Sequence, residues 1–155
     1  MQELKQQVLD WATEKGITKP ENASRQFLKL IEEYGEFHEG LLEDDRAKLG
    51  DAIGDCYVVA IILAEQTSSF LNVSKRQTEL LPAHFSHMQI NLSRVAEALA
   101  KNKSYGNHLQ EFIDGLEHVA IDRGFNPKEE LEKVLAIITK RKGTTVNGVF
   151  IKDEP

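Results

Sequence analysis

The sequence contains few of the residues that mark a disulfide-bonded or zinc-binding protein. Its single cysteine, Cys56, excludes an internal disulfide and gives no indication of an oxidising compartment. Cys56 lies in an apolar segment, where a buried small side chain is a commoner role than a nucleophile. The histidines show no HExxH or paired Cys/His spacing, which argues against zinc. No P-loop, GxSxG or GxGxxG sequence occurs, so the corresponding hydrolase and nucleotide-binding classes have no support.

Long apolar runs and an excess of positive charge are also missing. The longest strongly apolar stretch, Cys56–Ala64, is far shorter than the ~20 residues that a membrane-spanning helix needs. Residues 1–16 are amphipathic and lack the apolar core of a secretory signal. The net charge of −6 argues against general nucleic-acid binding, which usually requires a basic surface. We therefore expect a cytoplasmic protein with no membrane or nucleic-acid partner.

The spacing of apolar residues predicts an all-α fold in one domain spanning residues 1–155. A chain of this length can bury a substantial core, and its 28% charged and 41% hydrophobic residues are typical of a globular protein. The pattern indicates two helical hairpins together with an N-terminal and a C-terminal helix. After a first helix that ends at Gly16, the predicted helices cover about residues 21–43, 46–70, 89–102, 107–123 and 127–142.

The remaining segments are less regular. Residues 71–88 are expected to be only partly helical. The tail 144–155 is rich in β-forming residues, and Asn147-Gly148 predicts the turn of a short hairpin. Because an isolated hairpin is marginally stable, we expect it to lie on the helices or on a second chain. Residues 92–122 repeat the rhythm of residues 27–63, either as a degenerate copy that completes a four-helix bundle or by chance.

Carboxylates on two consecutive predicted helices are the most informative feature. At about 100° per residue, Glu33 and Glu36 border the apolar face of the helix 21–43, whereas Glu32 points further toward solvent. Asp51 and Asp55 begin the next helix, and Asp55 is followed by residues that are apolar in every direction. An unpaired carboxylate there is costly, so Asp55 must be protonated, ion-paired or metal-bound. Oxygen ligands from two antiparallel helices would suit Mg²⁺, with Mn²⁺ as an alternative.

Structural alternatives remain open for these charges. Glutamates on a helix are often merely solvated, and Asp55 can instead form a buried ion pair. The candidate partners for Asp55 are Lys29, Arg46 and Lys48. The basic run 140–142 either complements the negative end of its helix or contacts phosphate.

The acidic segments resemble the MazG-like nucleoside triphosphate pyrophosphohydrolases, whose signature is EExxE followed by ExxD. Here Glu32-Glu33-x-x-Glu36 precedes Gly54-Asp55. The tail, 140–143 followed by 146–151, is similar to the C-terminal segment of MazG-like proteins of phages and prophages. These stretches cover well under half of the chain. The first acid of ExxD is replaced by Ala52, and the neighbouring Asp51 is the candidate substitute.

The resemblance implies an all-α, Mg²⁺-dependent enzyme that cleaves (d)NTP to (d)NMP and pyrophosphate, with a role in nucleotide-pool house-cleaning. It implies metal ligation by Glu33, Glu36, Asp51 and Asp55. Glu32 or Glu36 would take the proton from the attacking water. Lys29, Lys140 and Arg141 are the candidate phosphate contacts. The family also implies a homodimer or homotetramer.

Two other functions remain compatible with these residues. One is a base-specific relative, such as a dUTP, dCTP or phosphoribosyl-ATP pyrophosphohydrolase. The other is a helical binding or regulatory protein that has lost catalysis, which Ala52 would favour.

Overall fold

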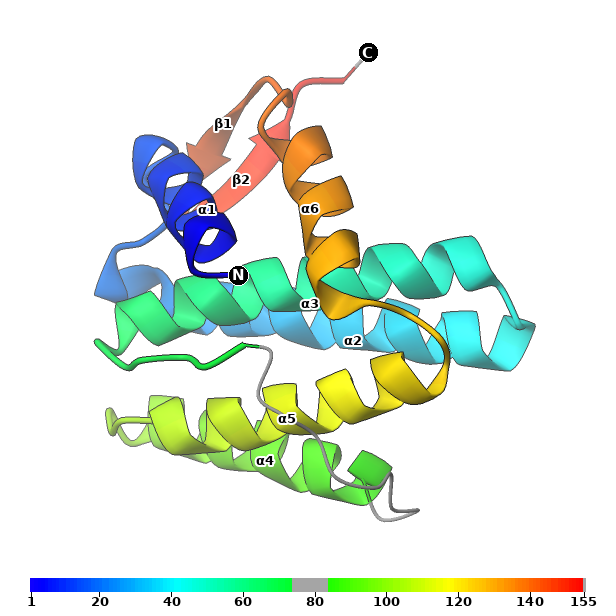
Figure 1. Ribbon diagram of the computed structural model, residues 1–155. Coiled ribbons are helices and arrows are strands. Elements are labelled where there is room, and N and C mark those ends of the chain that lie inside the picture. The colour runs from blue at the N-terminus through cyan, green and yellow to red at the C-terminus, as the bar shows by residue number, and fades with distance from the viewer. Residues whose placement is uncertain (74–83, 155) are drawn as a thin grey trace.

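Six α-helices and a C-terminal β-hairpin form the fold in the computed structural model, which describes residues 1–73 and 84–154 (Figure 1). The helices are α1 (Gln2–Glu14), α2 (Ala23–Glu43), α3 (Arg46–Gln66), α4 (His84–Ala100), α5 (Gly106–Asp122) and α6 (Pro127–Ile138). A 3₁₀ turn, Pro20–Asn22, precedes α2, and the strands are β1 (Gly143–Val146) and β2 (Val149–Lys152). This architecture confirms the predicted all-α bundle with a short β tail.

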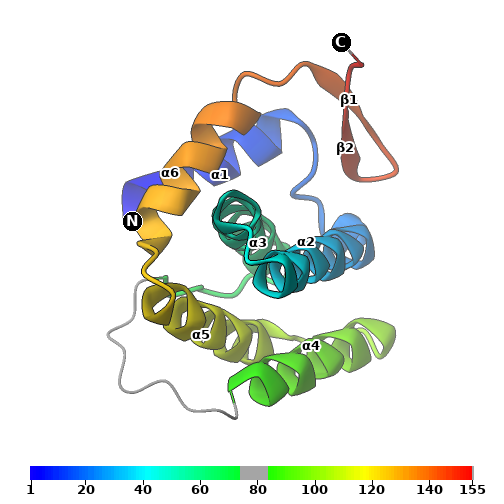
Figure 2. The ribbon, with the colours of Figure 1, turned by 90° about the vertical axis from the view of Figure 1, so that its right-hand side faces the viewer.

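Helix α3 lies at the centre of the fold. Helices α1, α2, α5 and α6 all pack against it, and Figure 2 shows it between α2 and the α1–α6 side. Every residue from Cys56 to Ala64 is buried, which confirms the prediction of a helix that is apolar in all directions. Burying one large aliphatic side chain contributes about 1.5–3 kcal/mol, so α3 supplies much of the stabilising free energy. No helix in the described ranges has the length and apolar character that crossing a membrane requires.

Two antiparallel helical hairpins form the body of the molecule. In the first, Asp44 adopts a left-handed conformation (φ 52°) after α2, and the Asp45 side chain caps α3 by accepting from the Lys48 amide at 3.0 Å. The second hairpin consists of α4 and α5. The two meet where the Tyr34 ring packs edge-on against Phe112, with centroids 5.2 Å apart. The hairpins thus pack on one another as expected, while their origin by duplication stays a prediction.

Several helix ends differ from their predicted positions. Helix α3 ends at Gln66, short of residue 70, because the chain turns at Ser68 with a positive φ of 53°. Helix α6 ends at Ile138, short of residue 142, and the Thr139 hydroxyl donates to the Leu135 carbonyl at 2.8 Å. The basic run 140–142 therefore follows the helix and does not form its last turn. Helix α4 begins at residue 84, and residues 74–83 of the expected irregular segment lie outside the described residues.

The C-terminal hairpin lies on the helices of its own chain. Its strands pair with Val146 opposite Val149, and Asn147 and Gly148 both have positive φ (50° and 79°), as an Asn-Gly turn requires. The Gln26 side-chain amide of α2 donates to the Gly148 carbonyl at 3.0 Å. The Thr145 hydroxyl donates to the carbonyl of Lys15, just after α1. These contacts confirm the first of the two placements expected for the tail.

Helices α3 and α6 pack closely against each other at Gly54. A Cβ at this position would lie 2.5 Å from Cγ2 of Val134 and 2.7 Å from the carbonyl oxygen of Glu130. The two helices therefore pack at this distance only because residue 54 has no side chain. The contact brings the end of α6 to the side of α3 that carries Asp55.

Replacing Gly54 with alanine should lower the free energy of unfolding by about 1–3 kcal/mol, despite the higher helix propensity of alanine, because the added methyl overpacks the contact between α3 and α6. Urea denaturation of the variant and the parent protein measures the difference. An unchanged or higher midpoint would show that α6 is free to move away from α3.

Candidate functional site

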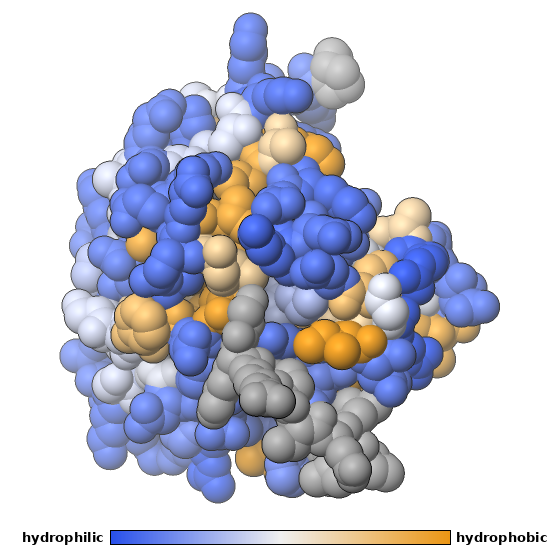
Figure 3. Space-filling model, in the orientation of Figure 1, coloured by the Kyte–Doolittle hydropathy of each residue, from blue (hydrophilic) through white to orange (hydrophobic). Residues whose placement is uncertain are grey.

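A cavity of about 540 Å³ lies where the α2–α3 hairpin faces α1, the end of α6 and strand β2. Its lining has a charged part and an apolar part. The charged part includes Lys29, Glu32, Glu33, Glu36, Asp55 and Arg141. The apolar part includes Trp11, Val58, Val59, Ile62, Ile138 and Phe150. Figure 3 shows apolar surface between the α1 and α6 sides of the molecule, with hydrophilic surface around it.

Carboxylates from α2 and α3 approach one another at this cavity. Glu33 is 8% exposed, and burial, followed by the negative charge of Asp55, raises its pKa to about 7, although Lys29 opposes the shift. Burial also raises the pKa of Asp55 to about 6; Arg141 lowers it, whereas Asp51 and Glu36 raise it. Both carboxyl groups therefore hold their protons more tightly than exposed acids do. The charges of Asp55 and Glu36 both act on Glu33, and all three carboxylates line the same cavity.

Lys29 is the cation that meets these acids from their own helix. Its Nζ lies 2.8 Å from Oε2 of Glu32 and 3.4 Å from Oε1 of Glu33. Burial lowers the pKa of Lys29, but the hydrogen bonds and charges of the two glutamates outweigh burial and raise it. A charged ammonium thus holds Glu32 and Glu33 in their observed orientations.

None of the three cations predicted as ion-pair partners of Asp55 has that role. Lys29 binds the glutamates of α2, and Nζ of Lys48 lies 2.7 Å from Glu43. The Arg46 guanidinium donates to two carbonyls at the end of α5. Within residues 1–73 and 84–154, Asp55 forms no ion pair, so the buried-pair alternative is wrong for these partners.

Two of the predicted site residues lie outside the cavity. Asp51 lines a separate cavity of about 380 Å³, together with Glu130 and Lys133 of α6. The crossing of α6 at Gly54 explains this separation, although Asp51 precedes Asp55 by a single helical turn. Both Lys140 and Arg141 follow the end of α6, but only Arg141 lines the cavity.

The acidic part of the cavity offers oxygen ligands, which Mg²⁺ prefers, but these ligands are not preassembled. In the described part of the chain, no three His, Cys, Asp or Glu side chains form a ready ligand group. The Glu33 carboxylate instead faces the Lys29 ammonium, with Oε1 3.4 Å from Nζ. Rotation between staggered side-chain conformers is the change that ligation by Glu33, Glu36 and Asp55 would require. The donor set therefore fits a hard divalent cation in chemistry.

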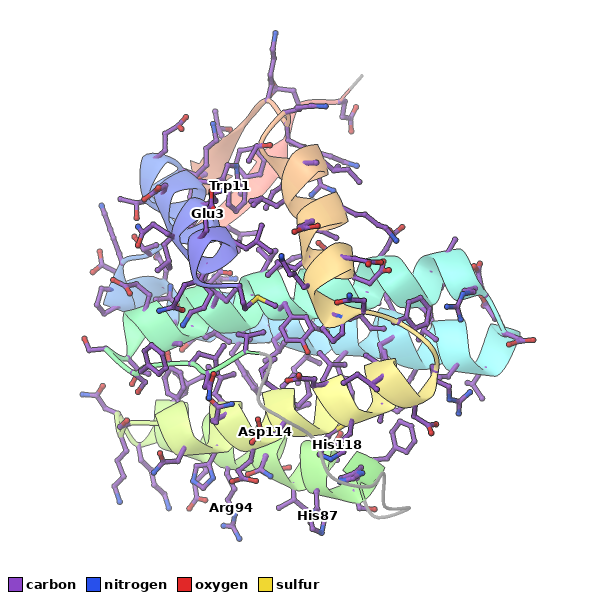
Figure 4. The ribbon with its side chains drawn as sticks, viewed as in Figure 1. Glu3, Trp11, His87, Arg94, Asp114 and His118 are labelled. Carbon is purple, nitrogen blue, oxygen red and sulfur yellow. The ribbon has the colours of Figure 1, made fainter. Side chains whose placement is uncertain are left out.

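Aromatic residues at the apolar part were not predicted as site residues. Trp11 of α1 lies beside β2, and its ring packs edge-on against Phe150 with centroids 5.7 Å apart (Figure 4). Its indole Nε1 is buried and has no hydrogen-bond partner among the described residues. The β-forming tail indicated a hairpin, but no sequence signal indicated that it docks against α1. Asp114 and His118 of α5 lie on the other side of α3 from Trp11, away from this cavity (Figure 4).

Comparison with known proteins shows a similarity to a phage protein. The chain is 36% identical over 66 residues to a protein of Haemophilus phage HP1 (strain HP1c1), described as an uncharacterized 18.2 kDa protein in the rep-hol intergenic region. The match covers 43% of this chain and 40% of the phage protein, so the chain spans about two fifths of the length of its relative. No protein-family model and no solved structure matches the chain. The similarity agrees with the expected phage connection and assigns no activity.

Proposed function

We propose that the protein is a Mg²⁺-dependent nucleotide pyrophosphohydrolase that cleaves (d)NTP to (d)NMP and pyrophosphate. The observation that carries the proposal is the composition of the large cavity. Glu33, Glu36 and Asp55 gather at a part flanked by Lys29 and Arg141, and the remaining wall is apolar and aromatic. A nucleotide has the matching halves, a polyanionic phosphate chain and a flat base.

Each group has a role that follows from its position. Glu33, Glu36 and Asp55 would hold the cation, which when bound neutralises phosphate oxygens and lowers the pKa of water. Glu32 is exposed at the rim and is suited to accept the proton of the attacking water, as is Glu36 when it is not engaged as a ligand. Catalysis by such a site rests on positioning and electrostatic stabilisation.

The cations and the apolar wall position the substrate. With a cation held by the carboxylates, Lys29 would be placed to bind a phosphate oxygen through its ammonium. The Arg141 guanidinium approaches from the opposite wall. Trp11 and Phe150 supply the flat apolar surface against which a base can pack.

One feature favours a second candidate, a helical binding or regulatory protein without catalysis. Ala52 occupies the position of the first acid in the ExxD signature, and it is fully inside the core at 1% exposure. Asp51, the candidate substitute, lines the other cavity. The site therefore offers one carboxylate fewer than the signature it resembles. A base-specific relative acting on dUTP, dCTP or phosphoribosyl-ATP remains part of the first candidate.

The nucleotides that the protein hydrolyses distinguish these candidates. With millimolar Mg²⁺ or Mn²⁺ we expect release of pyrophosphate, and no release of orthophosphate, from at least one member of a panel of ribo- and deoxyribonucleoside triphosphates and phosphoribosyl-ATP. Chromatography of the nucleoside monophosphate identifies the bond that is cleaved. Binding of nucleotides without turnover of any of them would establish the binding protein instead.

A further inference from the structure

Gln26 of α2 is a polar residue of the large cavity to which the proposed function gives no role. It lines the cavity and is only 4% exposed. Its side-chain Nε2 donates to the Gly148 carbonyl at 3.0 Å. Because a carbonyl oxygen can only accept, the group that faces Gly148 must be the amide nitrogen. The orientation of the side-chain amide is therefore fixed, and Oε1 is the atom left for another partner.

The Gly148 carbonyl is itself held in place at the tip of the β1–β2 hairpin. Gly148 has a φ of 79°, and a Cβ there would lie 2.3 Å from Cγ of Asn22. The hairpin tip thus packs directly on the turn that precedes α2, at a position that only glycine fits. Rotating the Gln26 amide would leave its buried nitrogen without this acceptor, which is unfavourable.

Oε1 of Gln26 accepts no hydrogen bond from residues 1–73 or 84–154. The indole Nε1 of Trp11 is also unpaired among these residues, but it is buried from solvent, whereas Oε1 is not. Since Gln26 is almost entirely buried, the accessible space next to Oε1 belongs to the cavity that this residue lines. The cavity therefore contains an oriented acceptor that a bound molecule can use.

This acceptor lies at the opposite end of the cavity from the carboxylates. Gln26 precedes Glu33 on α2 by seven residues, which is about 10 Å along the helix axis. Helix α3 runs antiparallel to α2, and Ile62 follows Asp55 by the same interval, so that Gln26 and Ile62 line the same end. A nucleotide with its phosphates at the carboxylates would extend its sugar and base along this length. The edge of the base remote from the sugar would then approach Gln26.

We infer that Gln26 recognises the base of the nucleotide, and that its Oε1 selects bases with an amino group on the edge remote from the sugar, as in cytosine and adenine. The inference rests on the proposed function and names the substrate class of the same site. The amino group donates to Oε1. Uracil, thymine and guanine carry a carbonyl oxygen at the corresponding position, which would place two acceptors against each other. A base that fills the cavity also displaces water from Oε1, so a mismatched base leaves this atom unpaired at a cost in affinity.

Binding of matched nucleotide pairs tests the inference without relying on turnover. One pair is the α,β-methylene analogues of dCTP and dUTP, which lack the bridging oxygen of the bond expected to break. The other pair is the same analogues of ATP and ITP, in which a carbonyl replaces the amino group of ATP. Trp11 is the one tryptophan of the chain and lines the cavity, so quenching of its fluorescence reports occupancy. With Mg²⁺ present, the amino member of at least one pair should bind at least about tenfold more tightly than its partner.

Two variants test whether Gln26 is the source of this preference. Gln26→Met keeps the length of the side chain and removes the acceptor, so the members of each pair should bind within about twofold of one another. Thr145→Val is the matched control, because the Thr145 hydroxyl also joins the hairpin to the body by donating to the Lys15 carbonyl, but Thr145 does not line the cavity. This variant should keep the preference of the parent protein. Circular dichroism shows whether each variant folds, and the comparison in the parent protein does not depend on either of them.

The outcomes separate this inference from the proposed function. Equal binding within both pairs, or tighter binding of the carbonyl members, would overturn the role of Gln26 whether or not the protein hydrolyses nucleotides. A preference that a folded Gln26→Met protein retains would also overturn it. A preference that depends on Gln26, together with no release of pyrophosphate from the unmodified nucleotides, would support base recognition and reject the hydrolase.

Discussion

Replacing Asp55 with asparagine is expected to lower Mg²⁺-dependent pyrophosphate release by about 100- to 1,000-fold. Asp55 is the carboxylate that α3 contributes to the large cavity, and the amide keeps its size while removing the charge that a divalent cation requires. Folding should not suffer, since burial already makes the ionised form of Asp55 unfavourable. Steady-state rates of the purified variant, compared with its melting temperature, separate the two effects.

Asp51→Asn is the matched control for this prediction. Asp51 lies one turn earlier on the same helix, but it lines the smaller cavity beside Lys133. The rate should therefore stay within a few-fold of the parent rate. Equal losses in the two variants would show that Asp51 acts as a ligand after all, in place of the acid missing at Ala52. An Asp55 variant with full activity would exclude this cavity as the site of hydrolysis.

Replacing Glu33 with glutamine should raise the free energy of unfolding by roughly 2–3 kcal/mol at about pH 8 without divalent cations. The pKa of Glu33 is about 7 in the folded protein, against the ordinary glutamate value of 4.5 in an unfolded chain, and the side chain is buried. The folded state therefore binds more protons than the unfolded state between these two values. Glutamine mimics the protonated form and removes the unfavourable ionisation.

The sign of this effect fixes its pH dependence. Because the pKa of Glu33 is raised by folding, its contribution to stability is fully present below its pKa in the unfolded chain. That contribution is lost as the pH rises through about 7. The parent protein should lose stability over this interval, and the glutamine variant should lose less. Urea titrations at several pH values measure both slopes. Identical slopes would show that Glu33 ionises without penalty.

Glu32→Gln serves as the control for Glu33. Glu32 contacts the same ammonium but is exposed, so its removal should change stability by no more than about 0.5 kcal/mol.

Added Mg²⁺ should raise the melting temperature of the parent protein, because a ligand that binds the native state stabilises it. The same addition should raise the melting temperature of the Glu33→Gln variant much less. The Glu33 carboxylate would then destabilise the metal-free protein and stabilise the metal-bound protein.

The acidic residues of the site could be predicted from the sequence because local helix geometry determines their positions. Glu33 and Glu36 follow from the angular spacing of one helix, and Asp55 follows from its place before an apolar run that had to be buried. Short links and strong periodicity fixed the order of the hairpins in the same way. These features depend on residues that are neighbours in sequence.

Features that depend on tertiary contacts were not predictable in this way. Angular spacing placed Asp51 with Asp55, but the close passage of α6 at Gly54 assigns them to different cavities. Lys140 was paired with Arg141, yet the early end of α6 at Ile138 leaves only Arg141 in the lining. Trp11 and Phe150 are in contact although they lie far apart in the sequence, and no local sequence pattern predicts this contact.

The contact between Trp11 and Phe150 also determines when the cavity is completed during protein synthesis. The wall opposite α2 and α3 contains Trp11, which precedes the central helices in the chain, and Phe150, which follows them. A nascent polypeptide that has already formed the central helices still presents an open trough there, because segments so distant in sequence join late. The cavity wall is complete only when strand β2 has been synthesised and packs beside the indole of Trp11.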